Sequence, residues 1–115
     1  KRRVMPVGNM VRHQSGKTVM NLTLVRVYLS DGRHEVRQVL KQLEQNKVRF
    51  TVFRGVAGLG SNGLVHKASI LDLSSDLPMV IEFFDKPEQI NDIITKIKTM
   101  VEVDHIVSWP VQSGI

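Results

Sequence analysis

The residue types that could do chemistry are densest at residues 54–63, where an arginine opens a run rich in glycine. Four of the eight glycines of the chain fall here, at Gly55, Gly58, Gly60 and Gly63. Glycines let backbone N–H groups face an anion, and Arg54 beside them could clamp a phosphate with two hydrogen bonds. No Gly-Lys-Ser/Thr follows, so this is not the phosphate loop of a nucleotide hydrolase. The run is either a plain hairpin connection or a loop shaped for a ligand or partner.

Two side chains stand at the ends of this loop, and each has two interpretations. Arg54 could bind a phosphate, or it could pair with Asp85 or Asp104 of the same or a neighbouring subunit. His66 could contact a base, a phosphate or a metal, or it could be an ordinary hydrogen-bonded strand residue. The histidines at 13, 34 and 105 have no ligand-like spacing with His66, so we predict no metal site.

Three charged residues near residue 85 form the remaining candidates. Glu82 is the single charge in an apolar run, and a carboxylate there needs a partner. Arg26 lies on the other doubly apolar run, so a structural ion pair of Arg26 with Glu82 is expected in place of a catalytic acid. Asp85 and Lys86 precede a helical pattern. Near the loop of a neighbouring subunit they could hold the ribose or a phosphate of a ligand, or they could cap the helix.

Several function classes are excluded by what the 115 residues contain. The chain has no cysteine, which rules out disulfides and thiolate metal sites and permits a reducing cytoplasm, the location we expect. No run of 18 apolar residues exists, so no membrane span is expected. No nucleophile–base pair or carboxylate pair can be argued from the spacing, and we predict that the protein is not an enzyme and requires no cofactor.

The elements that must position these residues follow the order βαβ(ββ)αβ. Alternating or apolar runs predict strands, and apolar residues at helical spacing predict helices. This order predicts an α+β, ferredoxin-like split βαβ sandwich, βαββαβ with an extra hairpin arm, in which an antiparallel sheet carries two helices on one face. The expected strands are residues 21–29, 48–54, 66–73, 79–84 and 105–111, and the expected helices are residues 33–45 and 86–101.

The expected strands 21–29 and 79–84 are apolar on both faces, yet two helices cover only one face of a sheet. The other face needs cover that the chain itself does not provide, which predicts self-association through the open face. Truncation or a missing partner domain is the rival explanation. The turn chemistry adds that Asp85 caps the second helix and that Asn46 ends the first in a left-handed conformation.

The formal charge of +5 is concentrated at the N-terminus. Residues 1–20 hold five of the 16 basic residues and none of the 11 acidic ones, so the rest of the chain is neutral. We interpret residues 1–20 as a basic arm, solvated and poorly ordered, and residues 21–115 as one domain. An arm of this kind could touch phosphates, but nucleic-acid binding is the weaker interpretation for a neutral body.

Three runs carry a resemblance to a known family: RGVAGLG at residues 54–60, HKASIL at 66–71 and the "DLP-x-VIE" pattern within 73–82. Over residues 22–111 the chain resembles an uncharacterised PII-like family of bacteria and archaea. It is more loosely similar to the PII signal-transduction proteins, in which a glycine loop after the second strand opens a long excursion, the T-loop. Here the equivalent excursion is residues 55–76.

The resemblance implies a homotrimer packed through its sheets, with an adenine nucleotide bound between neighbouring subunits. It further implies a signalling role in which residues 55–76 change shape with the ligand and dock on a protein target. The implied ligand site comprises Arg54, Gly55, Gly58, Gly60, His66, Asp85 and Lys86. The PII proteins carry a second glycine loop with a lysine where this chain has the acidic residues 102–105, so AMP or ADP is expected in place of ATP. The alternative is a metal-binding or structural trimer similar to the CutA proteins, without nucleotide binding.

Overall fold

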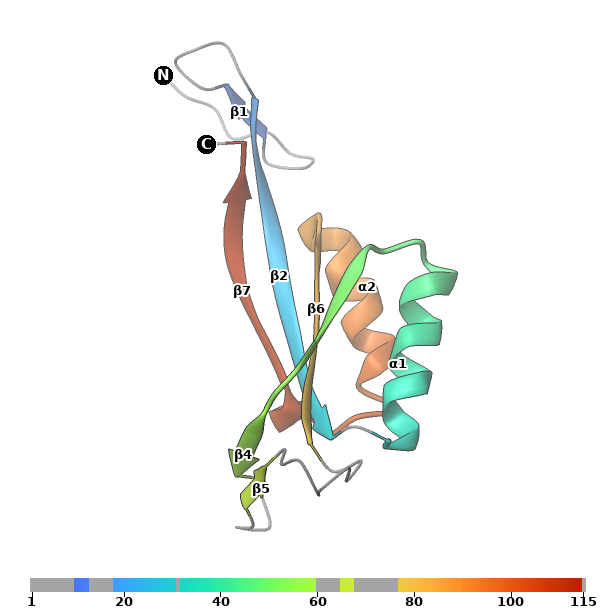
Figure 1. The fold of residues 1–115 in the computed structure, drawn as a ribbon. Coiled ribbons are helices and arrows are strands. Elements are labelled where there is room, and N and C mark those ends of the chain that lie inside the picture. The colour runs from blue at the N-terminus through green and yellow to red at the C-terminus, as the bar shows by residue number, and fades with distance from the viewer. Residues whose placement is uncertain (1–9, 13–17, 31, 60–64, 68–76, 115) are drawn as a thin grey trace.

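The structure is a computed structural model that describes residues 10–12, 18–30, 32–59, 65–67 and 77–114. Two helices lie together on one side of a sheet, and a small two-stranded arm extends from one end of that sheet (Figure 1). The strands are β1 (Met10–Arg12), β2 (Thr18–Ser30), β3 (Phe50–Arg54), β4 (Ala57–Leu59), β5 (Val65–Lys67), β6 (Pro78–Asp85) and β7 (Ile106–Ser113). The helices are α1 (His34–Gln45), α2 (Pro87–Ile97) and the short 3₁₀ helix η1 (Val103–His105).

The main sheet is antiparallel, with β2 and β6 at its centre. Strand β7 pairs with one edge of β2, β6 pairs with the other, and β3 pairs with β6 on the outside. Strand β1 pairs with the N-terminal end of β2, and β4 pairs with β5 as a separate hairpin. Numbered by their order in the chain, the four long strands lie as 4-1-3-2, and the predicted ferredoxin-like fold is confirmed.

The core lies between the helices and one face of the sheet. The alternation of β2 and β6 sends Val25, Val27, Ile81 and Phe83 toward the helices, where each is almost wholly buried. The helical spacing of Val39 and Leu43 in α1, and of Ile90, Ile93 and Ile97 in α2, brings these side chains onto the facing stripe, where they are fully buried. The two apolar helix faces predicted from the sequence are therefore the faces that cover the sheet.

Helix ends are where the sequence prediction is wrong in detail. The N-cap residue of α2 is Lys86 and not Asp85, and no side chain makes a capping hydrogen bond at this helix start. Asp85 instead accepts a hydrogen bond from the Lys86 backbone N–H at 2.7 Å. Pro87 opens the helix as expected. The left-handed residue after α1 is Lys47, with φ of 57°, and not Asn46, whose φ is −95°.

Two segments differ from the expected boundaries. Residues 57–59, expected as loop, form strand β4, and the strand expected at residues 66–73 is described only at Val65–Lys67, because residues 68–76 lie outside the described part. Strand β2 begins at Thr18, within the basic N-terminal arm expected at residues 1–20, and it pairs there with β1. Most of residues 1–20 lies outside the described residues, so their division from the domain stays a prediction.

The second face of the sheet is open, as predicted. Among the described residues, the alternation along each strand directs its side chains away from both helices. Five of its large apolar side chains keep between 39% and 47% of their surface exposed: Tyr28, Phe53, Phe84, Val107 and Trp109. We call this surface the open sheet face. A single chain leaves it uncovered.

Candidate functional site

The glycine run begins where β3 leaves the main sheet, and its first glycine is fixed by a neighbour. Arg54, the last residue of β3, pairs with Met79 and has an exposed side chain. The Gly55 N–H then donates to the Pro78 carbonyl at 2.8 Å. A Cβ at Gly55 would lie 2.7 Å from the Pro78 ring. This residue is glycine because the backbone passes directly over a proline.

The second glycine is fixed in the same way. A Cβ at Gly58 would lie 3.0 Å from Cγ of Pro78 and 3.3 Å from its Cβ. Gly58 sits in β4 opposite His66 of β5, so the run forms one strand of a hairpin. Neither Gly55 nor Gly58 has a positive φ. Close packing on Pro78 therefore explains both glycines without a ligand, while Gly60 lies outside the described residues.

The remaining candidates lie at the other end of the same strand. Strand β6 runs from Pro78, beside Gly55, to Asp85, and Lys86 follows as the N-cap of α2. Six residues separate Met79 from Asp85, which corresponds to about 20 Å along a strand. Lys86 is exposed, and its carbonyl accepts the first helical hydrogen bond from Ile90 at 3.0 Å.

The predicted site residues thus form two groups that one chain cannot bring together. Arg54, Gly55, Gly58 and His66 gather at the end of the sheet that carries the arm, and Asp85 with Lys86 lies at the opposite end (Figure 1). A ligand of nucleotide size cannot contact both groups within one copy. A site that uses both groups needs two copies of the chain.

The predicted ion pair between Arg26 and Glu82 is confirmed, at the centre of the open sheet face. The two residues are directly opposed across β2 and β6, and Nη2 and Nε of Arg26 each lie 3.1 Å from Oε2 of Glu82. Hydrogen bonding to Tyr28, and then to Glu82, raises the pKa of Arg26 above its ordinary value. This pair places two opposite charges in contact on the open sheet face.

The sequence prediction missed what surrounds this pair. The Arg26 guanidinium carbon lies 6.0 Å from the centre of the Phe53 ring and 5.9 Å from that of Trp109. A guanidinium at this distance from an aromatic face gains a cation–π attraction. Strand pairing could have revealed part of this arrangement, because Trp109 on β7 is a diagonal neighbour of Arg26, whereas Phe53 lies on β3, on the far side of β6.

A second missed feature is the Pro78 packing, which the sequence carries only as the proline of the "DLP" run. The pairing of Arg54 with Met79 brings that proline under the glycine run. The proline was therefore visible in the sequence, but its packing on the glycines could be predicted only with the register of β3 against β6.

Two comparisons with known proteins agree with the fold. A model of the family DUF190, described as "Uncharacterized ACR, COG1993", matches residues 22–113. A protein of Aquifex aeolicus (strain VF5) named UPF0166 protein is 29% identical over 86 residues, which cover 70% of this chain and 82% of that protein.

Solved structures resemble the chain in fold. CPII from Thiomonas intermedia K12, a nitrogen regulatory PII-like protein bound to ADP, AMP and bicarbonate, aligns with a TM-score of 0.65 at 18% identity, over 84% of this chain and 92% of that one. The divalent ion tolerance protein CutA1 from Ehrlichia chaffeensis aligns with a TM-score of 0.55 at 11% identity, over 83% of each chain. In the described part of the chain, no helix has the length and hydropathy that crossing a membrane requires.

Proposed function

The chain belongs to the DUF190 family, and its fold is similar to that of PII-like proteins. We propose that it is a regulatory protein and not an enzyme. In this proposal a homotrimer binds an adenine nucleotide between neighbouring subunits. The excursion at residues 55–76 then changes shape with the ligand and controls a protein target. The location we propose is the cytoplasm.

One observation carries the proposal: the two groups of candidate residues lie at opposite ends of β6. The arm end supplies Arg54, and the other end supplies Asp85 and Lys86. A shared ligand therefore requires the arm end of one copy beside the α2 end of the next. The open sheet face provides the apolar surface through which such copies would pack.

The charges of the candidate residues, and of the turn at the arm end of the sheet, indicate the class of ligand. Arg54 and Lys86 are exposed cations suited to phosphate oxygens. At the arm end of the sheet, Glu102 and Asp104 are exposed acids that would repel a long phosphate chain. CPII, whose fold is similar to that of this chain, is bound to ADP and AMP. We therefore propose AMP or ADP in preference to ATP for this chain.

Calorimetric titration of the confirmed oligomer with AMP, ADP and ATP tests the ligand. We expect saturable heat with AMP or ADP, and a loss of affinity of about tenfold or more when Arg54→Ala or Lys86→Ala removes a charged contact. Lys41→Ala, an exposed cation of α1, is the matched control and should bind as the wild type does. Absence of heat with all three nucleotides would leave a structural trimer as the better account.

A mixing experiment tests whether the site is shared between copies. Chains carrying Arg54→Ala are unfolded and refolded together with chains carrying Lys86→Ala. If one copy supplies Arg54 and its neighbour Lys86, random mixing regenerates about one intact site in four. Recovery of wild-type affinity at that fraction of sites supports the shared site. A mixture that binds no better than either parent contradicts it.

A further inference from the structure

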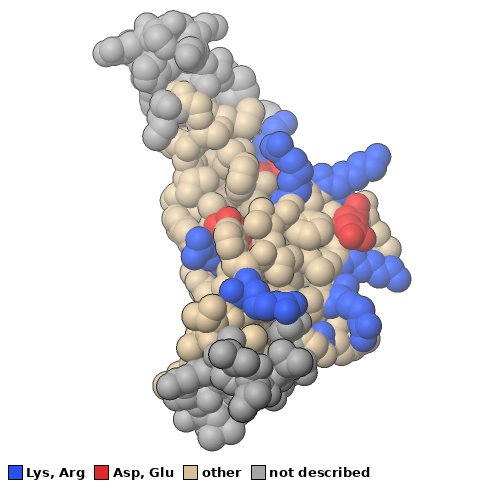
Figure 2. Space-filling view, viewed as in Figure 1, with Lys and Arg blue, Asp and Glu red and all other residues tan. Residues whose placement is uncertain are grey.

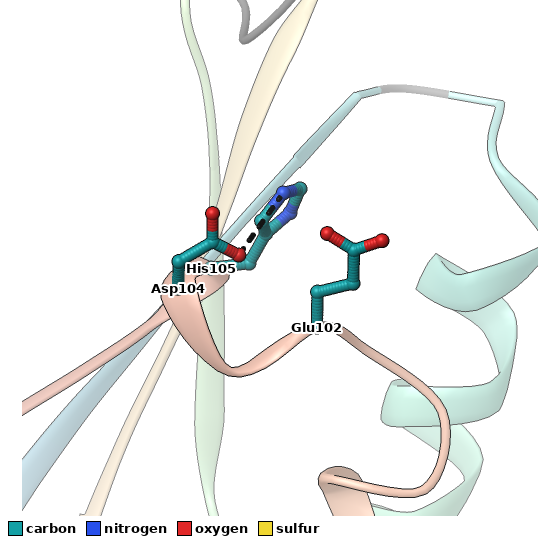
Figure 3. Close-up of side chains that lie close together, drawn as sticks. All are labelled: Glu102, Asp104 and His105. Carbon is teal, nitrogen blue, oxygen red and sulfur yellow. Dashed lines mark ion pairs between the residues drawn. The ribbon is translucent and has the colours of Figure 1, made fainter.

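The turn between α2 and β7 gathers three side chains of types that can ligate a metal ion, Glu102, Asp104 and His105. The 3₁₀ helix η1 is closed by a hydrogen bond from the His105 N–H to the Glu102 carbonyl at 3.0 Å. In such a turn the side chains three residues apart, here Glu102 and His105, lie on one side, and a ligand atom of Asp104 also lies within 4.8 Å of theirs. Figure 3 shows the imidazole between the two carboxylates.

The spacing of the donor atoms is close to what one ion needs. One ligand atom from each residue can be chosen so that all three lie within 4.8 Å of one another. Nε2 of His105 lies 3.9 Å from Oδ1 of Asp104. Ligands about 2.1 Å from a tetrahedral zinc ion are about 3.4 Å apart. Rotations of two exposed carboxylates suffice to close that difference.

The histidine distinguishes this turn from an ordinary group of solvated acids. Its Nδ1 atom is buried and has no hydrogen-bond partner among the described residues. Asp104 is too far from Nε2 for a hydrogen bond, so neither ring nitrogen is satisfied by the described chain. A buried ring nitrogen without a partner costs free energy, and coordination of a cation by that nitrogen removes the cost.

The charge of the turn also favours a cation. Among the described residues, the only ion pair of Glu102 or Asp104 is the one with His105. Two carboxylates and a neutral imidazole carry a charge of −2, which one divalent ion neutralises. One nitrogen with two oxygen ligands is a donor set for borderline ions such as Zn²⁺ or Co²⁺, whereas Mg²⁺ and Ca²⁺ prefer oxygen alone.

We propose that Glu102, Asp104 and His105 bind one divalent first-row transition ion, for which Zn²⁺ is the probe. The three residues supply three ligands from a single turn and leave further positions to water or to an anionic ligand. The bound ion would tie the end of α2 to the start of β7. The site shares no residue with the proposed nucleotide contacts at Arg54 and Lys86, but the bound ion would neutralise the two acids whose repulsion disfavours ATP.

Calorimetric titration of chelator-treated full chain with ZnCl₂, without nucleotide, tests the proposal. We expect one ion per chain and at least a tenfold weaker affinity for each of Glu102→Gln, Asp104→Asn and His105→Gln. The controls His34→Gln and Glu88→Gln change one exposed histidine and one exposed acid elsewhere, and they should bind as the wild type does. Far-UV circular dichroism of every variant checks that the fold is retained.

Imidazole ¹⁵N chemical shifts, recorded with and without Zn²⁺, identify the histidine that binds. A shift of the His105 ring nitrogens, with the His34 ring unchanged, supports the site. Two results would overturn it: no saturable binding by the wild type, or equal affinity in the wild type and all three variants, which would place the ion at another histidine.

Discussion

At the scale of single residues, the end of α1 is the clearest place where sequence and conformation disagree. The Val48 N–H donates to the Leu43 carbonyl at 3.0 Å, and the Lys47 N–H donates to Glu44 at 3.1 Å. These two bonds form the Schellman motif, in which the residue at the position of Lys47 is usually glycine. Lysine in the left-handed region costs about 1–2 kcal/mol. The buried Val48 holds it there by packing at the turn.

Replacing Lys47 with glycine should therefore stabilise the protein. The strain relieved exceeds the added freedom of glycine in the unfolded chain, which costs about 0.5–1 kcal/mol. We expect Lys47→Gly to raise the free energy of unfolding by up to about 1 kcal/mol in urea denaturation. Glu44→Gly, at an exposed helical position of the same turn, should lower it by about 1 kcal/mol. A loss of stability in Lys47→Gly would mean that the lysine side chain matters more than its backbone.

The Arg26–Glu82 pair makes a second prediction at this scale. Each partner is the counter-charge of the other on an apolar surface, so removing one leaves the other unpaired. We expect Arg26→Met to lower the midpoint of thermal unfolding more than the double replacement Arg26→Met with Glu82→Leu. The measurement is differential scanning calorimetry of the four members of the cycle. If the two single effects simply add in the double variant, the pair contributes no coupling.

At the scale of elements, the junction of β3, β4 and β6 decides how the arm leaves the sheet. Gly55 and Gly58 both pack on the ring of Pro78, and the Gly55 N–H is bonded to the Pro78 carbonyl. These contacts anchor the hairpin β4–β5 to the first residue of β6. The direction of the arm is thus set by packing, and a ligand that redirects it must disturb this junction.

This junction gives a prediction with an internal control. Gly55→Ala places a methyl group 2.7 Å from the Pro78 ring, and such overpacking costs about 1–3 kcal/mol. Replacing Pro78 with alanine in the same chain removes the obstructing ring and should restore most of the stability. Gly58→Ala, where the contact is 3.0 Å, should cost less. Chemical denaturation of the wild type, Gly55→Ala, Pro78→Ala and the double variant measures the coupling, and an uncoupled double variant would contradict the packing argument.

These elements also show what the sequence could and could not predict. The periodicity of apolar residues gave both helices and the long strands, because burial against a sheet imposes it. The pairing of Arg26 with Glu82 followed from two charges on two doubly apolar strands. The role of Gly55 could not be predicted from the sequence, because glycine is the residue expected both where the backbone packs closely on a proline and where it binds an anion. The register that brings Pro78 beneath it is a tertiary property.

The two ends of β6 make the same point for the candidate site. The family resemblance grouped Arg54 with Asp85 and Lys86 as one ligand site between neighbouring subunits. The antiparallel pairing of β3 with β6 separates them by the length of a strand. The turn at Glu102–His105 was noticed only for its acidity, since its donors converge through a 3₁₀ turn that histidine spacing does not reveal.

At the scale of the whole molecule, charge and apolar surface are divided between the two sides of the sheet. Lys and Arg side chains gather on the side of the helices (Figure 2). On the open sheet face, the described charges are the paired Arg26 and Glu82, surrounded by exposed aromatic side chains. This division favours water on the helix side and another copy of the chain on the open side.

The open sheet face yields the last prediction, because its rings contribute most of the apolar surface that an oligomer would bury. An aromatic side chain that is about two-fifths exposed gains about 2 kcal/mol when that surface is covered. Trp109→Glu and Phe53→Glu each remove this gain and add a charge that would have to be buried, on β7 and on β3 respectively. Light scattering coupled to size exclusion should find these variants at the mass of one 13.0 kDa chain and the wild type at a multiple of it.

Thr95→Glu adds the same charge on the exposed side of α2 and should leave the mass of the oligomer unchanged. An oligomer that survives both replacements, with circular dichroism unaltered, would mean that the copies meet through a strand edge or the arm, and the open sheet face would then need a different occupant.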